Sequence, residues 1–146
     1  MIRENLEDYL SVLAGYRRLV QEGHKGAIVS LGGRRRAVRT VAATGIAQNL
    51  TPSPEAVAGI FTPPSDTHDL GVVILEGTIL AAHCQFPLPK FDPAWGEETK
   101  RLGSRHRAAM GMSLATGAEV LVLSEETGSI RVARGGKLIP LDIEHG

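Results

Sequence analysis

The sequence is poor in cysteine, in aromatic side chains and in net charge. Its single cysteine, Cys84, cannot form a disulfide within the chain, which favours a reducing compartment. Aromatic residues make up 4% of the chain, and with one tryptophan and two tyrosines few rings can stack on nucleic-acid bases. Sixteen lysines and arginines balance sixteen aspartates and glutamates, so binding to polyanions through overall charge is disfavoured.

Long apolar runs are also missing. The longest, such as residues 72–75, are far shorter than the roughly 20 residues that a membrane-spanning helix needs. The residues after Met1 do not form the apolar segment of a secretory signal. We therefore expect a cytoplasmic location, with no membrane segment in this chain.

The length and apolar content fit one domain, residues 1–146. The chain has 146 residues, of which 42% are hydrophobic. Helical spacing of leucines predicts an N-terminal helix over about 4–22, with Asn5 as its cap and Gly23 as its stop, followed by a core over about 24–141.

Within this core, strands are predicted at 26–31, 37–43, 70–76, 78–84, 120–123, 130–133 and 137–141. Helices are predicted over 54–61, capped by Ser53, and from Ser104 onward. Connections of both hairpin and crossover length predict an α/β fold with a mixed central sheet flanked by helices.

A basic run, Gly103-Ser104-Arg105-His106-Arg107, lies at the predicted start of a helix. Free backbone amides and arginine side chains at such a start can converge on a phosphate group. A capped and solvated helix start is the plain alternative.

Two short polar clusters that contain carboxylates flank predicted strands. His68-Asp69 could hold a divalent metal, or form an ordinary polar turn. Ser124-Glu125-Glu126 follows a predicted buried strand, where ligand-binding residues are common, although an acidic surface turn has the same pattern.

Two further clusters carry weaker signals. Cys84 and three histidines, His68, His83 and His106, lack the paired spacing of a zinc site, so Cys84 is expected in the core. Arg34-Arg35-Arg36 could contact nucleic acid or an acidic partner, or form a solvated turn. The low aromatic content argues against nucleic acid as a partner.

Two stretches carry a resemblance to a known family. Leu102-Gly-Ser-Arg-His-Arg-Ala-Ala-Met-Gly-Met-Ser113, followed by Val-Leu-Ser-Glu-Glu-Thr-Gly128, resembles the diadenylate cyclase domain of the DisA N-terminal type. That family reads Leu-Gly-Thr-Arg-His-Arg-Ala-Ala-Leu-Gly and then Val-Ser-Glu-Glu-Thr-Gly at the same distance. His68-Asp69 and Cys84-Gln85-Phe86-Pro87-Leu88 are similar to its His-Asp-Gly-Ala and Cys-Tyr-Leu-Pro-Leu segments, so the resemblance covers most of residues 20–141.

The resemblance implies an enzyme that condenses two ATP molecules into cyclic di-AMP and releases two pyrophosphates. It implies a divalent metal, Mn²⁺ or Mg²⁺, as cofactor. It also implies a homodimer in a facing arrangement, because each subunit holds one of the two ATP molecules.

The resemblance also assigns roles to residues of this chain. Asp69 would assist the attacking hydroxyl or the metal, and Arg105 and His106 would act with it on the phosphates. The implied metal ligands are His68, Asp69 and Glu126. The implied nucleotide-binding residues are Leu70, Gly71, Phe86 beside adenine, Ser104, Arg105, His106, Arg107, Ser124 and Glu125.

The chain departs from the family pattern at one of these motifs. It reads Asp69-Leu70-Gly71 where the family reads Asp-Gly-Ala, and a leucine side chain fills space that glycine leaves open for a ligand. The alternative function is therefore a catalytically silent module that binds ATP or cyclic di-AMP without turnover.

Overall fold

A seven-stranded sheet forms the centre of the molecule, in the strand order β2-β4-β3-β1-β5-β6-β7. The computed structural model describes residues 6–23, 26–61, 70–89, 104–124 and 127–141. The strands are β1 (Ala27–Leu31), β2 (Ile46–Leu50), β3 (Leu70–Leu75), β4 (Thr78–Gln85), β5 (Glu119–Leu123), β6 (Ile130–Arg134) and β7 (Lys137–Leu141). β1 pairs with β3 in parallel, and the other neighbouring strands pair antiparallel, so the predicted mixed sheet is confirmed.

Two tight hairpins follow the turn residues of the sequence. Glu76 and Gly77, between β3 and β4, have φ values of 53° and 76°. Gly135 and Gly136, between β6 and β7, have φ values of 59° and 82°. Two successive positive φ angles match the twist of adjacent strands, and glycine adopts them without steric cost.

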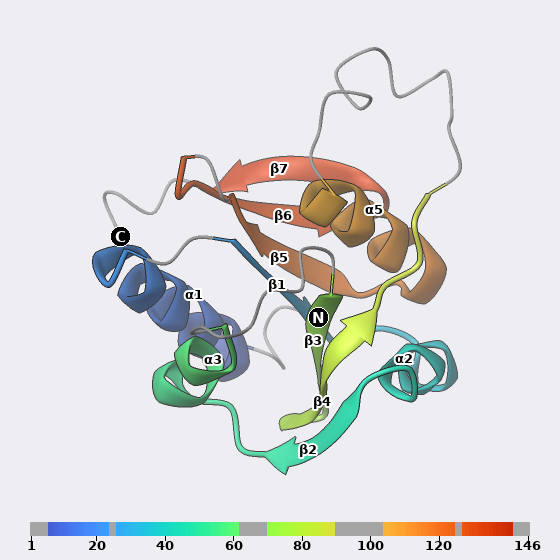
Figure 1. Cartoon of the computed structure of the whole chain (residues 1–146). Coiled ribbons are helices and arrows are strands. Elements are labelled where there is room, and N and C mark those ends of the chain that lie inside the picture. Colours follow the sequence, from blue (N-terminus) through green and yellow to red (C-terminus); the bar gives the residue numbers. More distant parts are fainter. Residues whose placement is uncertain (1–5, 24–25, 62–69, 90–103, 125–126, 142–146) are drawn as a thin grey trace.

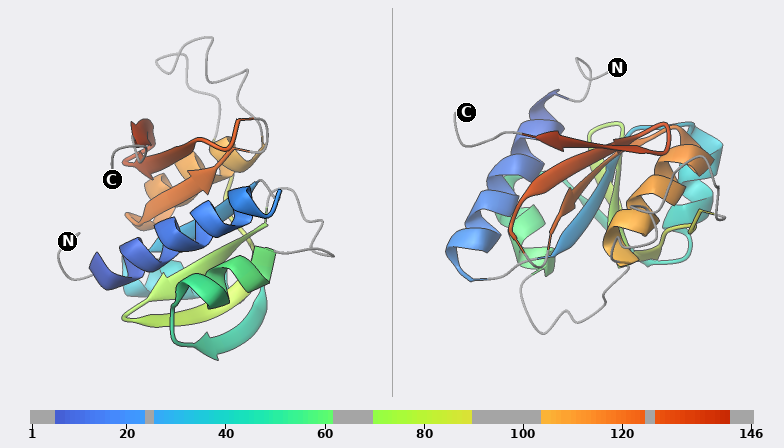
Figure 2. Two further views of the ribbon diagram at one scale, coloured as in Figure 1. Left: turned by 90° about the vertical axis from the view of Figure 1, so that its left-hand side faces the viewer. Right: turned by 90° about the horizontal axis from the view of Figure 1, so that it is seen from above.

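Helices cover both faces of the sheet (Figures 1 and 2). α1 (Leu6–Gln21) and α3 (Pro54–Phe61) lie on one face, and α2 (Arg35–Ala42) and α5 (Ser104–Thr116) lie on the other. Ser53 caps α3 as predicted, because its hydroxyl accepts a hydrogen bond of 3.0 Å from the Ala56 amide. Gly23, with φ +83°, follows the end of α1. The Asn5 cap lies outside the described residues.

Alternation along the central strands divides the core into two layers. Val29, Val72 and Leu121 pack under α1 and α3, whereas Ile28, Val73 and Val122 pack under α2 and α5. Each strand therefore buries side chains on both faces, which explains its nearly continuous apolar sequence.

The strand predicted over 37–43 is wrong, since this segment belongs to α2. Val38 and Val41 lie three residues apart, and both are buried on one side of the helix, while Thr40 is exposed. Their β-branched side chains resemble those of a strand, but their spacing suits a helix.

The edge strand β2 was not predicted. Ile46 and Leu50 are exposed, and Asn49 has a φ of 61° beside an irregular pairing with β4. A strand held by backbone pairing at a sheet edge has little hydrophobic periodicity for sequence reasoning to detect. Within the described residues, no helix combines the length and apolar character needed to cross a membrane.

Candidate functional site

The ends of three adjacent central strands meet at one edge of the sheet. Ala27 of β1 pairs with Leu123 of β5, so Gly26 lies level with Ser124. The parallel pairing of β1 with β3 places Val29 opposite Val72 and, in the same register, Ala27 level with Leu70. The predicted residues Leu70, Gly71 and Ser124 are thereby brought to one place.

The start of α5 adds the basic run to this edge. Ser104 and Arg107 are exposed, and Arg105 and His106 are half-buried. The first turn contains no acidic residue, so no carboxylate within the turn itself offsets the positive charge of its arginine side chains and of the helix N-terminus. This arrangement suits an anion such as a phosphate group.

Arg105 connects this helix start to β1. A Cβ atom at position 26 would lie 2.7 Å from Arg105 Cζ, so the guanidinium group lies directly across the Gly26 backbone. Burial raises the pKa of the Tyr16 phenol well above its usual value, and a backbone hydrogen bond at Val29 and then the positive charge of Arg105 offset part of that rise. The Nε2 atom of His106 is buried.

Ser124 begins a tight turn after β5. Its amide donates a hydrogen bond of 2.9 Å to the Ser129 carbonyl, and its own carbonyl accepts one of 3.1 Å from the Gly128 amide. The Ser124 hydroxyl accepts a long hydrogen bond of 3.4 Å from the Thr127 amide, and the residue is 9% exposed. The turn holds the serine at the end of β5, facing the start of β1.

Phe86 and Gly71 pack against each other at the start of β3. A Cβ atom on Gly71 would lie 2.6 Å from Phe86 Cζ. Because side chains alternate along a strand, Leu70 is directed to the opposite face of the sheet from Gly71. Leu70 is half-buried, and Phe86 is 3% exposed.

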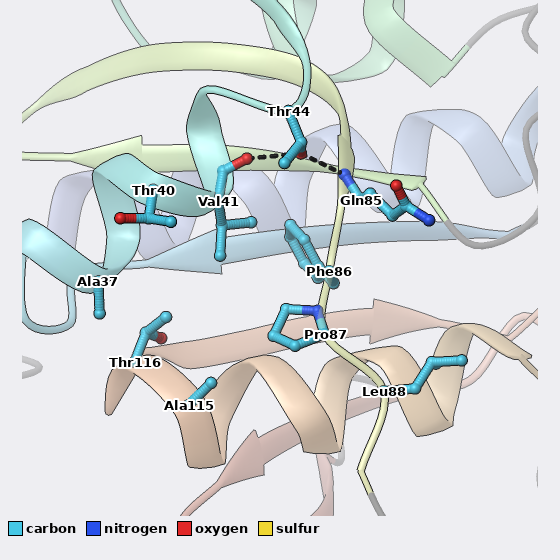
Figure 3. A pocket seen from close by; sticks show the side chains of 10 residues that line it. All are labelled: Ala37, Thr40, Val41, Thr44, Gln85, Phe86, Pro87, Leu88, Ala115 and Thr116. Atoms are coloured by element: carbon cyan, nitrogen blue, oxygen red, sulfur yellow. Dashed lines mark hydrogen bonds between the residues drawn. The ribbon is translucent and has the colours of Figure 1, made fainter.

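The segment after β4 is fixed against α5 and α2. A Cβ atom on Gly111 of α5 would lie 1.8 Å from the Pro87 carbonyl oxygen, so this glycine lets the backbone of residues 87–89 approach the helix. Thr44 accepts a hydrogen bond of 2.8 Å from the Gln85 amide and donates one of 2.6 Å to the Val41 carbonyl, as Figure 3 shows.

A cavity of about 630 Å³ lies between these elements (Figure 3). Its lining is mostly apolar and consists of Ala37, Thr40, Val41, Thr44, Gln85, Phe86, Pro87, Leu88, Ala115 and Thr116. Since a helix rises about 1.5 Å per residue, Ala115 lies roughly 16 Å along α5 from Ser104. Ala115 is therefore distant from the basic helix start, while Phe86, another lining residue, lies against Gly71.

The arginines of residues 34–36 have structural contacts. The Arg34 side chain donates a hydrogen bond of 2.6 Å to the Ala115 carbonyl, and its amide donates one of 2.7 Å to the Thr116 carbonyl, so Arg34 caps the end of α5. Arg35 forms an ion pair of 3.6 Å with Glu76. These contacts favour a structural role for this part of the run.

Several predicted site residues lie outside the described part of the chain: His68, Asp69, Glu125 and Glu126. Within the described part, no group of three or more histidine, cysteine, aspartate or glutamate side chains could hold a metal. Cys84 is buried with its Sγ 3.9 Å from the Ala42 carbonyl oxygen, as expected for a core residue.

Sequence reasoning missed two glycines that shape this region, Gly26 and Gly111. Each permits a close approach by a segment distant in sequence, and such an approach leaves no local pattern. The only local signal for Gly26 was its place as the first residue of the buried strand predicted over 26–31.

One known protein family matches most of this chain. The family described as DisA bacterial checkpoint controller nucleotide-binding, or DAC, matches residues 16–138. The chain belongs to this family.

Named relatives are diadenylate cyclases. The chain is 40% identical over 95 residues to the cyclic di-AMP synthase CdaA of Bacillus subtilis, a match covering 65% of this chain and 33% of that protein. It is 38% identical over 113 residues to a diadenylate cyclase of Listeria monocytogenes, covering 77% of this chain and 40% of that protein. The chain thus spans about a third to two fifths of the length of these relatives.

Solved structures share the fold. A double mutant of DacA from Staphylococcus aureus superposes with a TM-score of 0.78 at 30% identity, covering 94% of this chain and 88% of that chain. A structure described as a hypothetical membrane spanning protein from Bacillus cereus gives a TM-score of 0.79 at 30% identity, covering 94% and 64% of the two chains.

Proposed function

We propose that this chain is a diadenylate cyclase, which condenses two ATP molecules into cyclic di-AMP and releases two pyrophosphates. The observation that carries the proposal is the placement of Arg105, at a helix start without acidic residues, across the start of β1 and level with Ser124. A planar guanidinium group matches phosphate oxygens in geometry and charge. The names of the relatives add support.

The reaction asks the protein mainly for positioning and charge neutralisation. The ribose 3′ oxygen of each ATP forms a bond to the α-phosphorus of the other ATP. The bond from that phosphorus to the oxygen bridging the α- and β-phosphates breaks, and pyrophosphate leaves. Each attacking hydroxyl gives up one proton, which we assign to Asp69 as acceptor.

The remaining roles are those that the family motif implies for this chain. Ser104, Arg105 and His106 would bind the phosphates from the start of α5, beside Arg107, and Ser124 would meet the triphosphate from the end of β5. Leu70, Gly71 and the backbone at Phe86 would contact the nucleoside, and Glu125 would lie at the nucleotide. Because two ATP molecules must exchange bonds, two subunits must face each other, and a homodimer is required for turnover.

A divalent cation, Mn²⁺ or Mg²⁺, is the proposed cofactor. His68, Asp69 and Glu126 would hold it, and carboxylate oxygens with one imidazole form a donor set that suits Mn²⁺, while the carboxylates suit Mg²⁺. When bound, the cation would neutralise part of the triphosphate charge.

A second candidate function, a silent nucleotide-binding module, is favoured by Leu70. This leucine occupies the position at which a glycine would leave room for a ligand. Such a module would retain the phosphate contacts of Arg105 and Ser104 and lose turnover.

Incubation of the purified chain with ATP and Mn²⁺ or Mg²⁺, with mass detection of the nucleotides, tests both candidates. The cyclase predicts cyclic di-AMP, and Asp69→Asn should abolish it while ATP affinity in a parallel titration stays largely unchanged. ATP binding without product would favour the silent module. Absence of ATP binding as well would contradict both.

A further inference from the structure

Gly26 is the residue on which the Arg105 side chain rests. A Cβ atom at position 26 would lie 2.7 Å from Cζ, 2.8 Å from Nη1 and 3.0 Å from Nη2 of Arg105. All three distances are below ordinary van der Waals contact, so the guanidinium group occupies the space that a side chain at position 26 would fill. Gly26 also has a φ of +95°, a conformation that other residues rarely adopt.

The place of Gly26 in the sheet explains why this contact matters. Gly26 directly precedes β1, the strand that lies between β3 and β5. It is level with Ser124, and the next residue, Ala27, is level with Leu70. The Arg105 side chain, which lies across Gly26, is therefore close to both Ser124 and Leu70 of the candidate nucleotide site.

Arg105 starts from the second position of α5, so the helix alone leaves its long side chain with many conformers. Contact with the β1 backbone restricts those conformers. A charged group held in advance binds phosphate at a lower entropic cost than one that must be ordered on binding.

We propose that Gly26 is a positioning residue for Arg105: its missing side chain and left-handed backbone let the guanidinium group lie across the start of β1, where it meets the phosphates of a bound nucleotide. The inference rests on the proposed nucleotide site and adds a residue to it. Gly26 touches no reacting atom in this account and acts only through Arg105.

The chain offers a matched control in Gly23. Gly23 has a similar φ, +83°, and a Cβ atom there would meet nothing within 4 Å. Gly26→Ala and Gly23→Ala both place an alanine in the left-handed region, but only Gly26→Ala displaces Arg105. The guanidinium is the far end of a flexible side chain, so it can swing aside and the Gly26→Ala variant is expected to fold.

The test compares Gly23→Ala, Gly26→Ala, Arg105→Ala and the double variant Gly26→Ala/Arg105→Ala in the full chain. The measurements are thermal unfolding, ATP affinity by titration with Mn²⁺ or Mg²⁺, and the kcat and KM of cyclic di-AMP formation. We expect both glycine variants to lower Tm by similar amounts. Only Gly26→Ala should also weaken phosphate-dependent function, by about 10- to 100-fold, the loss typical of a misplaced positioning group.

The double variant separates positioning from general destabilisation. If Gly26 acts through Arg105, adding Gly26→Ala to Arg105→Ala should change the affinity or rate by less than about 2-fold. The inference would be overturned if the fold-losses of the two single variants multiply in the double variant. It would also be overturned if Gly23→Ala weakened ATP affinity or turnover as much as Gly26→Ala does.

The single and double variants are compared by ATP affinity as well as by turnover. A chain that binds ATP without forming product would therefore contradict only the proposed cyclase activity, and the affinities would still test the role of Gly26. A chain that binds no ATP would overturn both.

Discussion

The ring of Phe86 lies against the backbone of Gly71, at the point where β3 begins and β4 has just ended. A Cβ atom on Gly71 would lie 2.6 Å from Cζ, 2.9 Å from Cε2 and 3.1 Å from Cε1 of that ring. Phe86 is almost fully buried and packs with Cys84 and Ala108 in the layer under α2 and α5. The two residues therefore share one space, and the size of the side chain at either position limits the size that the other position can accommodate.

Gly71→Ala should destabilise the protein by about 1–3 kcal/mol, because the added methyl overlaps a packed ring. Phe86→Leu removes part of the ring and should also cost stability when made alone, by about 1 kcal/mol. The double variant Gly71→Ala/Phe86→Leu should be more stable than the sum of the two losses predicts. Urea unfolding of the four proteins measures this coupling, and strictly additive losses would show that the two positions are independent.

Gly111→Ala should be among the most damaging single-methyl additions in the protein. The added Cβ would lie 1.8 Å from the Pro87 carbonyl oxygen, a backbone atom that cannot swing aside. We expect a loss of about 3 kcal/mol or more in the free energy of unfolding.

Gly59→Ala is the matched control for this helical glycine. Gly59 lies in α3, and a Cβ atom there would meet nothing within 4 Å. Alanine is favoured over glycine in a helix, so Gly59→Ala should stabilise the protein by about 0.5–1 kcal/mol. Equal effects of the two substitutions in thermal or urea unfolding would show that the contact with Pro87 is not tight.

Ser30 and Ser113 are both buried serines, but substitution by alanine is expected to affect stability differently at the two positions. In the described part of the chain, the Ser30 hydroxyl has no hydrogen-bond partner, so Ser30→Ala should be neutral or stabilising by up to about 1 kcal/mol. Ser113 donates 2.8 Å to the Met110 carbonyl and accepts 2.9 Å from the Gly136 amide. Ser113→Ala should therefore cost about 1–3 kcal/mol, and a larger loss for Ser30→Ala than for Ser113→Ala would contradict this ranking.

Cys84 should be unreactive in the folded protein. It is fully buried, and burial raises the pKa of its thiol from 9.0 to about 11. A thiol reagent at pH 8 should label it far more slowly in the native protein than in urea, because the thiolate is the reactive form. Labelling at the same rate in both states would place Cys84 at the surface.

The same pKa shift gives a pH dependence of stability. The unfolded chain releases the Cys84 proton near pH 9 and the folded chain only near pH 11. The contribution of the Cys84 thiol to the free energy of unfolding is therefore fully present below pH 9 and falls by about 2 kcal/mol as the pH rises to 11. Cys84→Ala should remove that part of the alkaline loss, and an unchanged pH profile would contradict the shift.

Much of the fold was predictable because its signals are local. Both hairpins were marked by Glu76-Gly77 and Gly135-Gly136, and the start of α3 was marked by Ser53 and Pro54. α2 was assigned to a strand because Val38 and Val41 satisfy both a β-branched composition and helical spacing, and only packing decides between them. β2 depends on backbone pairing at an edge, which side-chain periodicity does not record.

The candidate site was predictable where a continuous motif carried it, as in Ser104-Arg105-His106-Arg107. The structure places Arg105 of this run against Gly26, at the same edge of the sheet as Ser124 and Gly71. Gly26 and Gly111 were missed because their roles depend on Arg105 and Pro87, which are distant in sequence. Close approach between distant segments becomes visible only once the fold is known.

The proposed cyclase activity is tested most directly by the ratio of pyrophosphate to cyclic di-AMP formed by the purified chain from ATP with Mn²⁺ or Mg²⁺. Two ATP molecules that exchange 3′ bonds must release two pyrophosphates for each ring closed, so we expect a ratio of two with no ADP or inorganic phosphate. Formation of ADP and phosphate without cyclic di-AMP would show hydrolysis at the terminal phosphate, and would contradict a cyclase built on Arg105 and the start of α5.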